Sequence, residues 1–571
     1  MRRLHGLLAI SVLATLPCSV QAQLGPEIQV NTQTSSDQAG PQIAADATGD
    51  FVVVWHDAGT IPVGLSARRF NSSGNPLGAQ LVVTSTGQSH AVASDAAGNF
   101  VVVWRRPENV FGRRFDAAGN PLGGEFQVNT NPPTYLGTAP TVAVAPTGEF
   151  VVAWPSVGYD GSAFGVFAQR YDAAGSPVGG EFLVNTYTTG DQVGPVAASD
   201  ASGNMVIVWF SLAQDGEGWG LYGQRYNAAG TPQGAEFAVN TYTTNHQFLH
   251  DVAADADGNF VVAWHSQGQD GDDGAIFARR FDAAANPLGG EFQVNTYTTG
   301  YQSRPDVGVD AAGSFAVAWI SPHDGDGFGI FGRRYDAAGA PVGGEFLVNG
   351  YTPHDQGSPA VTYTVAGDFV VTWESQRLDR EIFAQRYDAA GRQGVRGTRL
   401  TLGDASNGRR TVNVRGREVW SNSEVLGDPL ANGATLRVIA HGDADQDQVF
   451  AVPPGASAAG LPGWKPVSGG WTYTDPRGVN GPVRRAGVRR RSQNTFFLEV
   501  VIRGTATTPP PGIGVVPPGN GTDGGVIFSI LGPGGGTYCV DLGGANGGTA
   551  RSSANRFRVV GSTTETGCPA P

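Results

Sequence analysis

The chain is poor in lysine, cysteine, histidine and long apolar segments, and each shortage excludes a class of protein. It has 571 residues but only one lysine, Lys465, three cysteines and nine histidines. A structural zinc site needs clustered soft ligands, which these few residues do not supply. No GxSxG, P-loop or Rossmann glycine pattern is present, so nothing indicates an α/β-hydrolase or a nucleotide-binding fold.

The first 22 residues have the features of a secretory signal peptide. Arg2 and Arg3 precede the apolar run "LLAISVLATL", and "VQA" ends at Ala22. The apolar run is too short for a membrane-spanning helix, and no later segment is long and apolar enough to be one. A short N-terminal membrane anchor is the alternative. We therefore expect a secreted or cell-surface protein, with the periplasm as the alternative location, and without a transmembrane segment after cleavage.

Two cysteines remain after this cleavage. Because exported chains meet oxidising conditions, Cys539 and Cys568 are expected to form a disulfide near the C-terminus.

Acidic residues dominate the larger part of the chain. Residues 23–393 contain 17 basic and 38 acidic residues, whereas residues 394–571 contain 18 basic and 12 acidic residues. Nucleic-acid binding requires clustered Lys and Arg, so the acidic part is not expected to bind nucleic acid.

Seven tryptophans at nearly even spacing predict the architecture. The intervals are 49, 50, 55, 55, 55 and 54 residues, and each tryptophan ends an apolar run such as "GNFVVVW" or "GDFVVTW". A period near 50 residues in β-rich text is typical of a propeller. We predict an all-β chain with a seven-bladed β-propeller over 23–393. The seven tryptophans are Trp55, Trp104, Trp154, Trp209, Trp264, Trp319 and Trp373.

Each repeat divides into four short strands separated by turn signals. In the fifth copy we expect strands at 251–255, 259–264, 275–282 and 291–296. Only six copies are followed by their own fourth strand. The segment 26–32, "PEIQVNT", matches the missing one, so we expect this N-terminal strand to complete the last blade and close the ring.

Turn aspartates and strand arginines recur in every copy. Asp and Gly in "DAAGN" suit tight turns, where Asp accepts backbone N–H bonds and Gly supplies positive φ. The third strand of each copy carries an arginine, expected to pair with a turn carboxylate; a ring of anion-binding arginines is the alternative. These are Arg69, Arg114, Arg170, Arg225, Arg280, Arg334 and Arg386.

The loops between second and third strands are acidic and suggest calcium as a possible cofactor. Closely spaced carboxylates suit Ca²⁺, but the full "DxDxDG…E" loop is absent, and a Gly-Asp hairpin turn explains the same residues. The candidate ligands are Asp215, Glu217, Asp270, Asp272, Asp273, Asp324 and Asp326.

These loops share a face with the loops that join consecutive blades, so we expect a binding site there or at the central channel mouth. Isolated histidines in polar loops, such as His246 and His250, are expected to have no ligand role. The candidate binding residues are His56, His265, Tyr187, Tyr242, Tyr297 and Tyr351.

Residues 394–571 lack the repeat and contain short β-like runs. We expect a small β-sandwich-like domain, interrupted by a Pro/Gly-rich loop at 505–525.

The repeat "NTYTTGDQ…VAASD…QDGxG…QRYDAAGxPxGxEFxVNT" resembles tandem repeats in large secreted bacterial proteins, some of them calcium-linked adhesins or toxins of the RTX kind. The resemblance implies a passive or adhesive module. Unlike RTX proteins, the chain has no "GGxGxDxUx" nonapeptides, so calcium-triggered folding is not implied.

Two functions from different classes follow. The first is a secreted or cell-surface binding or adhesion module that engages a glycan or a surface protein through the loop face. The alternative is an extracellular carbohydrate-active hydrolase or lyase with its site at the channel mouth, although no sequence motif selects a catalytic pair.

Overall fold

The computed structural model is built from β-strands, and the residues that it describes contain no helix. It describes residues 27–387 except 35, 58–63, 108, 131–137, 365–366 and 377–378, and, between 392 and 560, the strands with a few residues beside them. The predicted signal peptide, Cys568 and most of the 505–525 loop lie outside the described residues. In the part described, no helix could cross a membrane.

Residues 28–387 form seven four-stranded antiparallel sheets. The first strands are β2 (Gln38–Ala45), β6 (Gln88–Ser94), β10 (Thr141–Val144), β14 (Gln192–Ser199), β18 (Gln247–Ala254), β22 (Ser303–Val309) and β26 (Gln356–Tyr363). The second strands are β3 (Phe51–Asp57), β7 (Phe100–Arg106), β11 (Phe150–Val157), β15 (Met205–Leu212), β19 (Phe260–Ser266), β23 (Phe315–Ser321) and β27 (Phe369–Gln376).

The outer half of each sheet is made by a long third strand and a short fourth strand. The third strands are β4 (Gly64–Phe70), β8 (Asn109–Phe115), β12 (Phe164–Tyr171), β16 (Trp219–Tyr226), β20 (Ala275–Phe281), β24 (Gly329–Tyr335) and β28 (Arg380–Tyr387). The fourth strands are β5 (Leu81–Thr84), β9 (Phe126–Gln127), β13 (Pro177–Leu183), β17 (Phe237–Ala238), β21 (Phe292–Gln293), β25 (Phe346–Leu347) and β1 (Ile28–Gln29).

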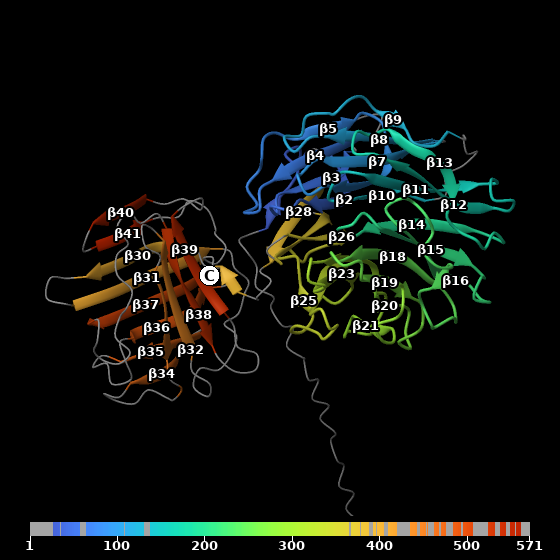
Figure 1. Cartoon of the computed structure of the whole chain (residues 1–571). Helices are drawn as coiled ribbons and strands as arrows, with labels where there is room; N and C mark the ends of the chain where they lie inside the picture. The colour runs from blue at the N-terminus through green and yellow to red at the C-terminus, as the bar shows by residue number, and fades with distance from the viewer. Residues whose placement is uncertain are drawn as a thin grey trace, which may run out of the picture.

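Consecutive sheets contact one another through their first strands, and the series returns from β26 to β2. These first strands surround the centre of the ring (Figure 1), which is the arrangement of a β-propeller. Strand β1 pairs with β28, with Ile28 opposite Ala384 and Gln29 opposite Phe383. The N-terminal segment therefore supplies the outermost strand of the sheet that contains β26–β28, where it was expected.

The repeated tryptophans form the core between sheets. All seven are at most 1% exposed. Trp264, for example, packs in one cluster with Val206 and Val208 of the preceding sheet and Phe277 of its own sheet. Because second strands are covered on both faces, they are apolar throughout, as "FVVVW" shows.

The predicted strands of the fifth copy are correct in number and order but differ at their ends. The first strand begins at Gln247 rather than at residue 251, and contains a bulge. The fourth strand has two residues instead of six, because Asn295 leaves the ladder to accept a hydrogen bond from the Ile276 N–H at 2.7 Å.

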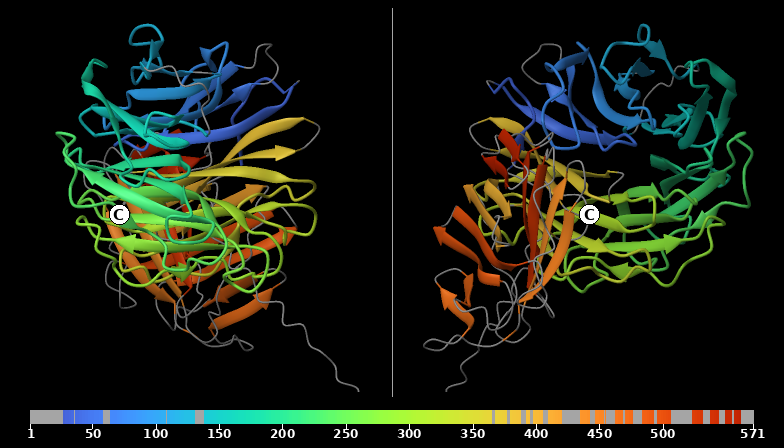
Figure 2. Two further views of the ribbon diagram at one scale, coloured as in Figure 1. Left: turned by 90° about the vertical axis from the view of Figure 1, so that its right-hand side faces the viewer. Right: turned by 60° about the vertical axis from the view of Figure 1, so that its left-hand side comes forward.

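The remaining strands form two further sheets that contact each other through β39 and β30, and Figures 1 and 2 show them as a second group of strands. The five-stranded sheet contains β29 (Arg392–Gly394), β39 (Thr537–Gly543), β38 (Asp523–Ile530), β32 (Ala434–His441) and β33 (Gln446–Val452). The eight-stranded sheet contains β34 (Gly463–Val467), β35 (Gly470–Thr474), β36 (Val483–Ser492), β37 (Thr495–Thr505), β31 (Arg409–Val419), β30 (Gly397–Asp404), β41 (Arg556–Val560) and β40 (Thr549–Ser553).

Candidate functional site

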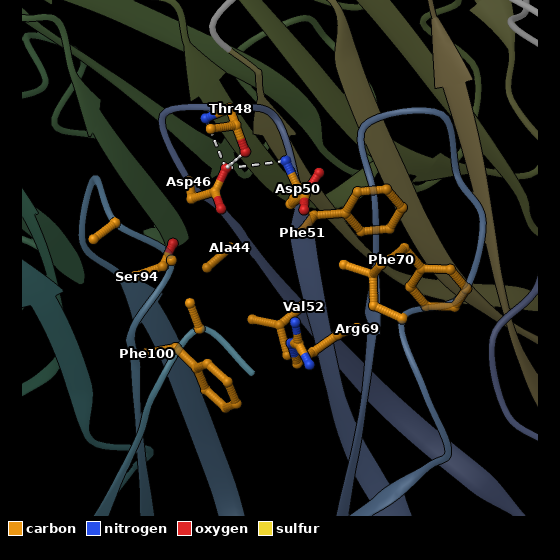
Figure 3. Close-up of a pocket in the computed structure, with 14 residues that line it drawn as sticks. Ala44, Asp46, Thr48, Asp50, Phe51, Val52, Arg69, Phe70, Ser94 and Phe100 are labelled. Atoms are coloured by element: carbon orange, nitrogen blue, oxygen red, sulfur yellow. Dashed lines mark hydrogen bonds between the residues drawn. The ribbon is translucent and has the colours of Figure 1, made fainter. Parts of the chain in front are cut away.

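The tight turns between the first and second strands are held by hydrogen bonds to their own aspartate side chains. In the turn between β2 and β3, the Asp46 carboxylate accepts hydrogen bonds from the backbone N–H groups of Thr48 and Asp50, at 2.8 and 3.0 Å (Figure 3). Asp95 and Asp255 make the same contacts in their own sheets. These aspartates are structural, as the turn pattern predicts.

The repeated arginines differ from the prediction. Three of them donate to backbone carbonyls of a turn in the neighbouring sheet rather than to a carboxylate. Arg170 Nη1, for instance, lies 2.6 Å from the Ala229 carbonyl oxygen, and Arg114 and Arg280 make equivalent contacts. Because turn carboxylates are already bound to backbone N–H groups, the carbonyls are the acceptors that remain. For these three arginines the ion-pair prediction is wrong. Their guanidinium N–H groups hold the neighbouring turn instead.

The acidic loops do not gather into a metal site. Among the described residues, no group of three or more His, Cys, Asp or Glu side chains could hold a metal ion. Asp270 Oδ1 instead accepts the Asp272 N–H at 3.2 Å, and Asp324 Oδ1 accepts the Asp326 N–H at 3.4 Å. Glu217 is exposed. The hairpin-turn interpretation accounts for these contacts.

In the loops of Asp215 and Asp324, this aspartate packs over the start of the third strand. A Cβ atom added at Gly220 would lie 2.3 Å from Asp215 Oδ2, and one added at Gly329 would lie 2.5 Å from Asp324 Oδ2. The carboxyl group thus occupies the space beside the glycine. Asp215 and Asp324 therefore have a packing role that requires glycine at the facing position.

The loops that carry the candidate tyrosines are fixed by an Asn–Gln pair. Asn295 Nδ2 donates to the Tyr297 carbonyl at 2.8 Å and to Gln302 Oε1 at 3.2 Å, while Gln302 Nε2 donates to the Thr299 carbonyl. Equivalent contacts hold the loops of Tyr187, Tyr242 and Tyr351. The shared "VNTYTT…Q" text is therefore explained by loop structure.

The Tyr297 ring lies over the next sheet. It stacks on His323 with ring centroids 4.2 Å apart, and His323 stacks on Phe331 at 3.7 Å. His323 Nε2 is 3.1 Å from Glu345 Oε1. The four candidate tyrosines are half-buried and occur at the same place in four successive inter-sheet loops, so they are spread around the ring and do not converge on one site.

The candidate histidines also have partners within the fold. His265 is 1% exposed, and its Nδ1 donates to the Gln302 carbonyl at 2.7 Å, while burial lowers its pKa. His56 is half-buried, with Nε2 3.4 Å from His90 Nδ1, and burial lowers its pKa as well. His250 was expected in a loop but lies in β18, buried, with Nε2 3.1 Å from the Val208 carbonyl. Burial lowers the pKa of His250 to about 4, so it is neutral at pH 7.

A different set of residues converges at the channel mouth. Six first strands carry a bulge next to their loop-face end, and the residue at the bulge has positive φ. The six residues and their φ angles are Gly40 (58°), Ser89 (44°), Gly194 (64°), Leu249 (48°), Arg304 (52°) and Ser358 (50°).

Glycine adopts this conformation freely, whereas another residue loses about 1–2 kcal/mol there. Leu249 and Arg304 accept that cost although both are exposed, Leu249 by 38%. Burial of these side chains therefore does not offset the strain in full. Strained residues with exposed side chains concentrate at functional sites, which marks the neighbouring strands β18 and β22 within an otherwise regular ring.

Two carboxylates lie two residues further along these strands. Asp251 Oδ2 accepts the Val307 N–H at 2.9 Å, and Asp306 Oδ1 accepts the Val361 N–H at 2.6 Å. The corresponding residues elsewhere are Gln42, Ala91, Thr141, Val196 and Ala360. The pair is therefore confined to one sector of the ring.

The electrostatics of this pair are unusual. Burial raises the pKa of Asp251 to about 6. The pKa of Asp306 is raised too, by burial and by the neighbouring charge of Asp251. Both residues remain partly accessible to solvent. Because each group affects the other, the two carboxyl groups titrate as a coupled pair and keep a proton to higher pH than isolated aspartates do.

An aromatic cluster borders the same sector. Phe248 and Tyr301 both contact His265, with ring centroids 4.9 and 5.0 Å from the imidazole. Tyr301 is 38% exposed, and its hydroxyl is 3.1 Å from Ser303 Oγ. We name Leu249, Asp251, Tyr301, Arg304 and Asp306 the mouth sector.

Sequence reasoning missed all five of these residues as site residues. The available signal was a break in the repeat. Where the first and fourth copies have "GP", the fifth has Leu249–His250 and the sixth has Arg304–Pro305, each followed by Asp. Residues that the repeats share build the scaffold. Residues that differ between the repeats mark the mouth sector.

Comparison with known proteins finds only distant similarity. No protein-family model and no curated protein matches the chain. A protein of unknown function from Dyadobacter fermentans is 12% identical, with a TM-score of 0.39, covering 65% of this chain and 99% of that protein. An α-L-arabinanase from Penicillium chrysogenum, solved with arabinobiose, is 11% identical, with a TM-score of 0.35 and coverages of 66% and 98%. The Dos1 propeller is 10% identical, with a TM-score of 0.34 and coverages of 68% and 92%. Similarities this distant assign no activity.

Proposed function

We propose that this chain is an exported glycan-binding protein whose site is the mouth sector of a seven-bladed β-propeller. In this proposal residues 1–22 direct export, β1 closes the last blade, and 394–571 form a separate sandwich-like domain stapled by Cys539 and Cys568. The C-terminal domain and the disulfide are not needed for the glycan site itself.

One observation carries the proposal: exposed, strained side chains and a carboxylate pair occur together in one sector of a ring that is otherwise built from repeats. Sugars are recognised by aromatic or apolar side chains that cover their C–H faces and by polar groups that bind their hydroxyls. Tyr301 and Leu249 supply the first kind of contact, and Asp251, Asp306 and Arg304 supply the second. A protein ligand, the other partner expected, would need about 800 Å² of contact surface on this chain, which is far more than these few side chains present.

A glycan array with the mature protein tests the proposal. We expect binding to a restricted set of glycans, and loss of that binding in a Leu249→Ala/Asp306→Asn double variant. Ser89→Ala is the matched control, because Ser89 occupies the same bulge position on β6. Binding that persists unchanged in the double variant would place the site elsewhere, and a silent array together with capture of a purified surface protein would refute the glycan assignment.

Hydrolysis is the second candidate, favoured specifically by the raised pKa values of Asp251 and Asp306. A glycosidase needs one protonated and one ionised carboxyl group beside the scissile bond, and a coupled pair can provide that state. Release of reducing ends from a polysaccharide panel, abolished in Asp251→Asn but retained in Ser89→Ala, is the expected result for an enzyme. Glycan binding without any such release would assign the sector to binding alone.

A further inference from the structure

The mouth sector contains one cation, and its surroundings leave it available. Arg304 is exposed at the bulge of β22, and its Nη1 donates to Ser358 Oγ on β26 at 3.2 Å. Arg304 belongs to neither the Arg106–Glu125 nor the His323–Glu345 ion pair, and within the part of the chain that the structure describes it has no carboxylate partner within 4.0 Å.

Three other arginines of the ring are engaged through more donors than Arg304. Arg114, Arg170 and Arg280 use two donors each on backbone carbonyls. Arg304 has five N–H donors, as every guanidinium does, and the structure engages it through a single serine hydroxyl. Its backbone is also strained, at a position where glycine would cost nothing.

The Ser358 contact positions the guanidinium. Ser358 occupies the bulge of the next first strand and has a φ of 50°, so both ends of the contact are held in the same unusual conformation. A serine that accepts from Nη1 restrains the side chain while the other edge of the planar group stays open. That arrangement suits a ligand that binds bidentately.

The ligand group that fits a guanidinium edge is a planar carboxylate. We infer that the glycan bound at the mouth sector carries a uronic acid unit, whose carboxylate pairs with Arg304 while its hydroxyls bind Asp251 and Asp306. This inference rests on the proposed glycan site and specifies its ligand class. The carboxylate would supply the counter-charge that Arg304 lacks within the ring.

The adjacent aspartates would oppose an anionic sugar if both were ionised. Each is anchored through one oxygen by a backbone N–H of the next strand. Burial raises the pKa of both groups, so the pair carries less than its full negative charge near pH 6. It can then donate a hydrogen bond to a sugar as well as accept one.

The test compares matched oligosaccharides by calorimetric titration of the full mature chain. The probes are an oligogalacturonate, the same oligosaccharide with its carboxyl groups reduced to alcohols, and a sulfated neutral oligosaccharide of equal length. We expect the uronate to bind at least tenfold more tightly than its reduced form, and Arg304→Gln to remove that preference by weakening the uronate much more than the reduced form. Ser358→Ala, which removes only the positioning contact, should reduce the preference by a smaller factor, and Ser89→Ala should leave it unchanged.

The outcomes separate the inference from the function on which it rests. Equal binding of the uronate and its reduced form, or tighter binding of the sulfated sugar, overturns the uronate inference and leaves the glycan site in place. If none of the three probes binds and the glycan array also gives no positive glycan, both the uronate inference and the glycan site are overturned. Arg304→Lys guards against misfolding as an explanation. It keeps the charge but loses the bidentate geometry, so it should retain the fold and lose most of the preference.

Discussion

The positive-φ residues of the mouth sector predict a reversal in the usual stability order of alanine and glycine. In an ordinary strand, glycine is less stable than alanine by about 0.5–1 kcal/mol, because it loses more conformational freedom on folding. At Leu249 and Arg304, with φ of 48° and 52°, alanine keeps the left-handed strain of about 1–2 kcal/mol and glycine relieves it. We therefore expect Leu249→Gly to be more stable than Leu249→Ala, and Arg304→Gly more stable than Arg304→Ala.

The comparison of two truncations at one site removes the side-chain contribution. Both variants of Leu249 lose the same contacts beyond Cβ, so the difference reports on the backbone and one methyl group. Leu183 is the matched control, because it is 37% exposed, against 38% for Leu249, and lies in strand β13 without positive φ. There the glycine variant should be the less stable one.

Urea unfolding followed by tryptophan fluorescence measures these differences, since eight of the 11 tryptophans lie in the seven sheets. Glycine and alanine variants of equal stability at both mouth positions, or the same order at Leu249 as at Leu183, would refute the claim of strain. The argument that these side chains are kept at a cost to stability would then have no basis.

Three further predictions concern the ring. Gly220→Ala should lower the free energy of unfolding by about 1–3 kcal/mol, because the new methyl group collides with Asp215. Ala275→Gly, at the equivalent position of β20, is the control, because it removes a methyl group where there is no such collision to relieve. Equal unfolding midpoints for Gly220→Ala and wild type would contradict the prediction. Deletion of residues 27–32 should lower the urea midpoint of unfolding. The deletion removes the hydrogen bond from the Ile382 N–H to Asn31 Oδ1, at 2.9 Å, and exposes the edge of β28. An unchanged midpoint would show that β1 does not stabilise the ring. Because the folded-state pKa of Asp251 is raised to about 6, this group favours folding most at low pH and loses that contribution as pH rises from about 4 through 6. Between pH 4.5 and 7.5, Asp251→Asn should therefore lose about 2 kcal/mol less stability than wild type. Identical pH profiles would argue against the raised pKa.

Most of the scaffold was predictable because it is repeated. The buried tryptophans, the Asp–Gly turns and the short fourth strands each follow from local chemistry that recurs in every copy. The pairing of β1 with β28 was also predictable, because segment 26–32 repeats the "EFQVNT" text. Strand ends were less predictable, since the bulge at Leu249 and the departure of Asn295 from its ladder depend on contacts with neighbouring strands.

The site was not predictable in the same way. The candidate tyrosines and His265 were selected for their residue type, but the fold uses them in loop anchoring and packing. Asp251 was placed in a strand, and nothing in the local sequence shows that its carboxylate accepts the Val307 N–H of the next sheet. The neighbouring carboxylates are 55 residues apart, so their proximity appears only once the sheets are arranged around an axis.

Hydrogen-exchange mass spectrometry with and without an array-selected glycan tests the central claim most directly. If the mouth sector binds the glycan, amides in 247–251 and 302–306 should exchange more slowly in the complex, while the loops of Tyr187 and Tyr351 should exchange as in the free protein. Protection confined to those outer loops, with the first strands unchanged, would contradict the account.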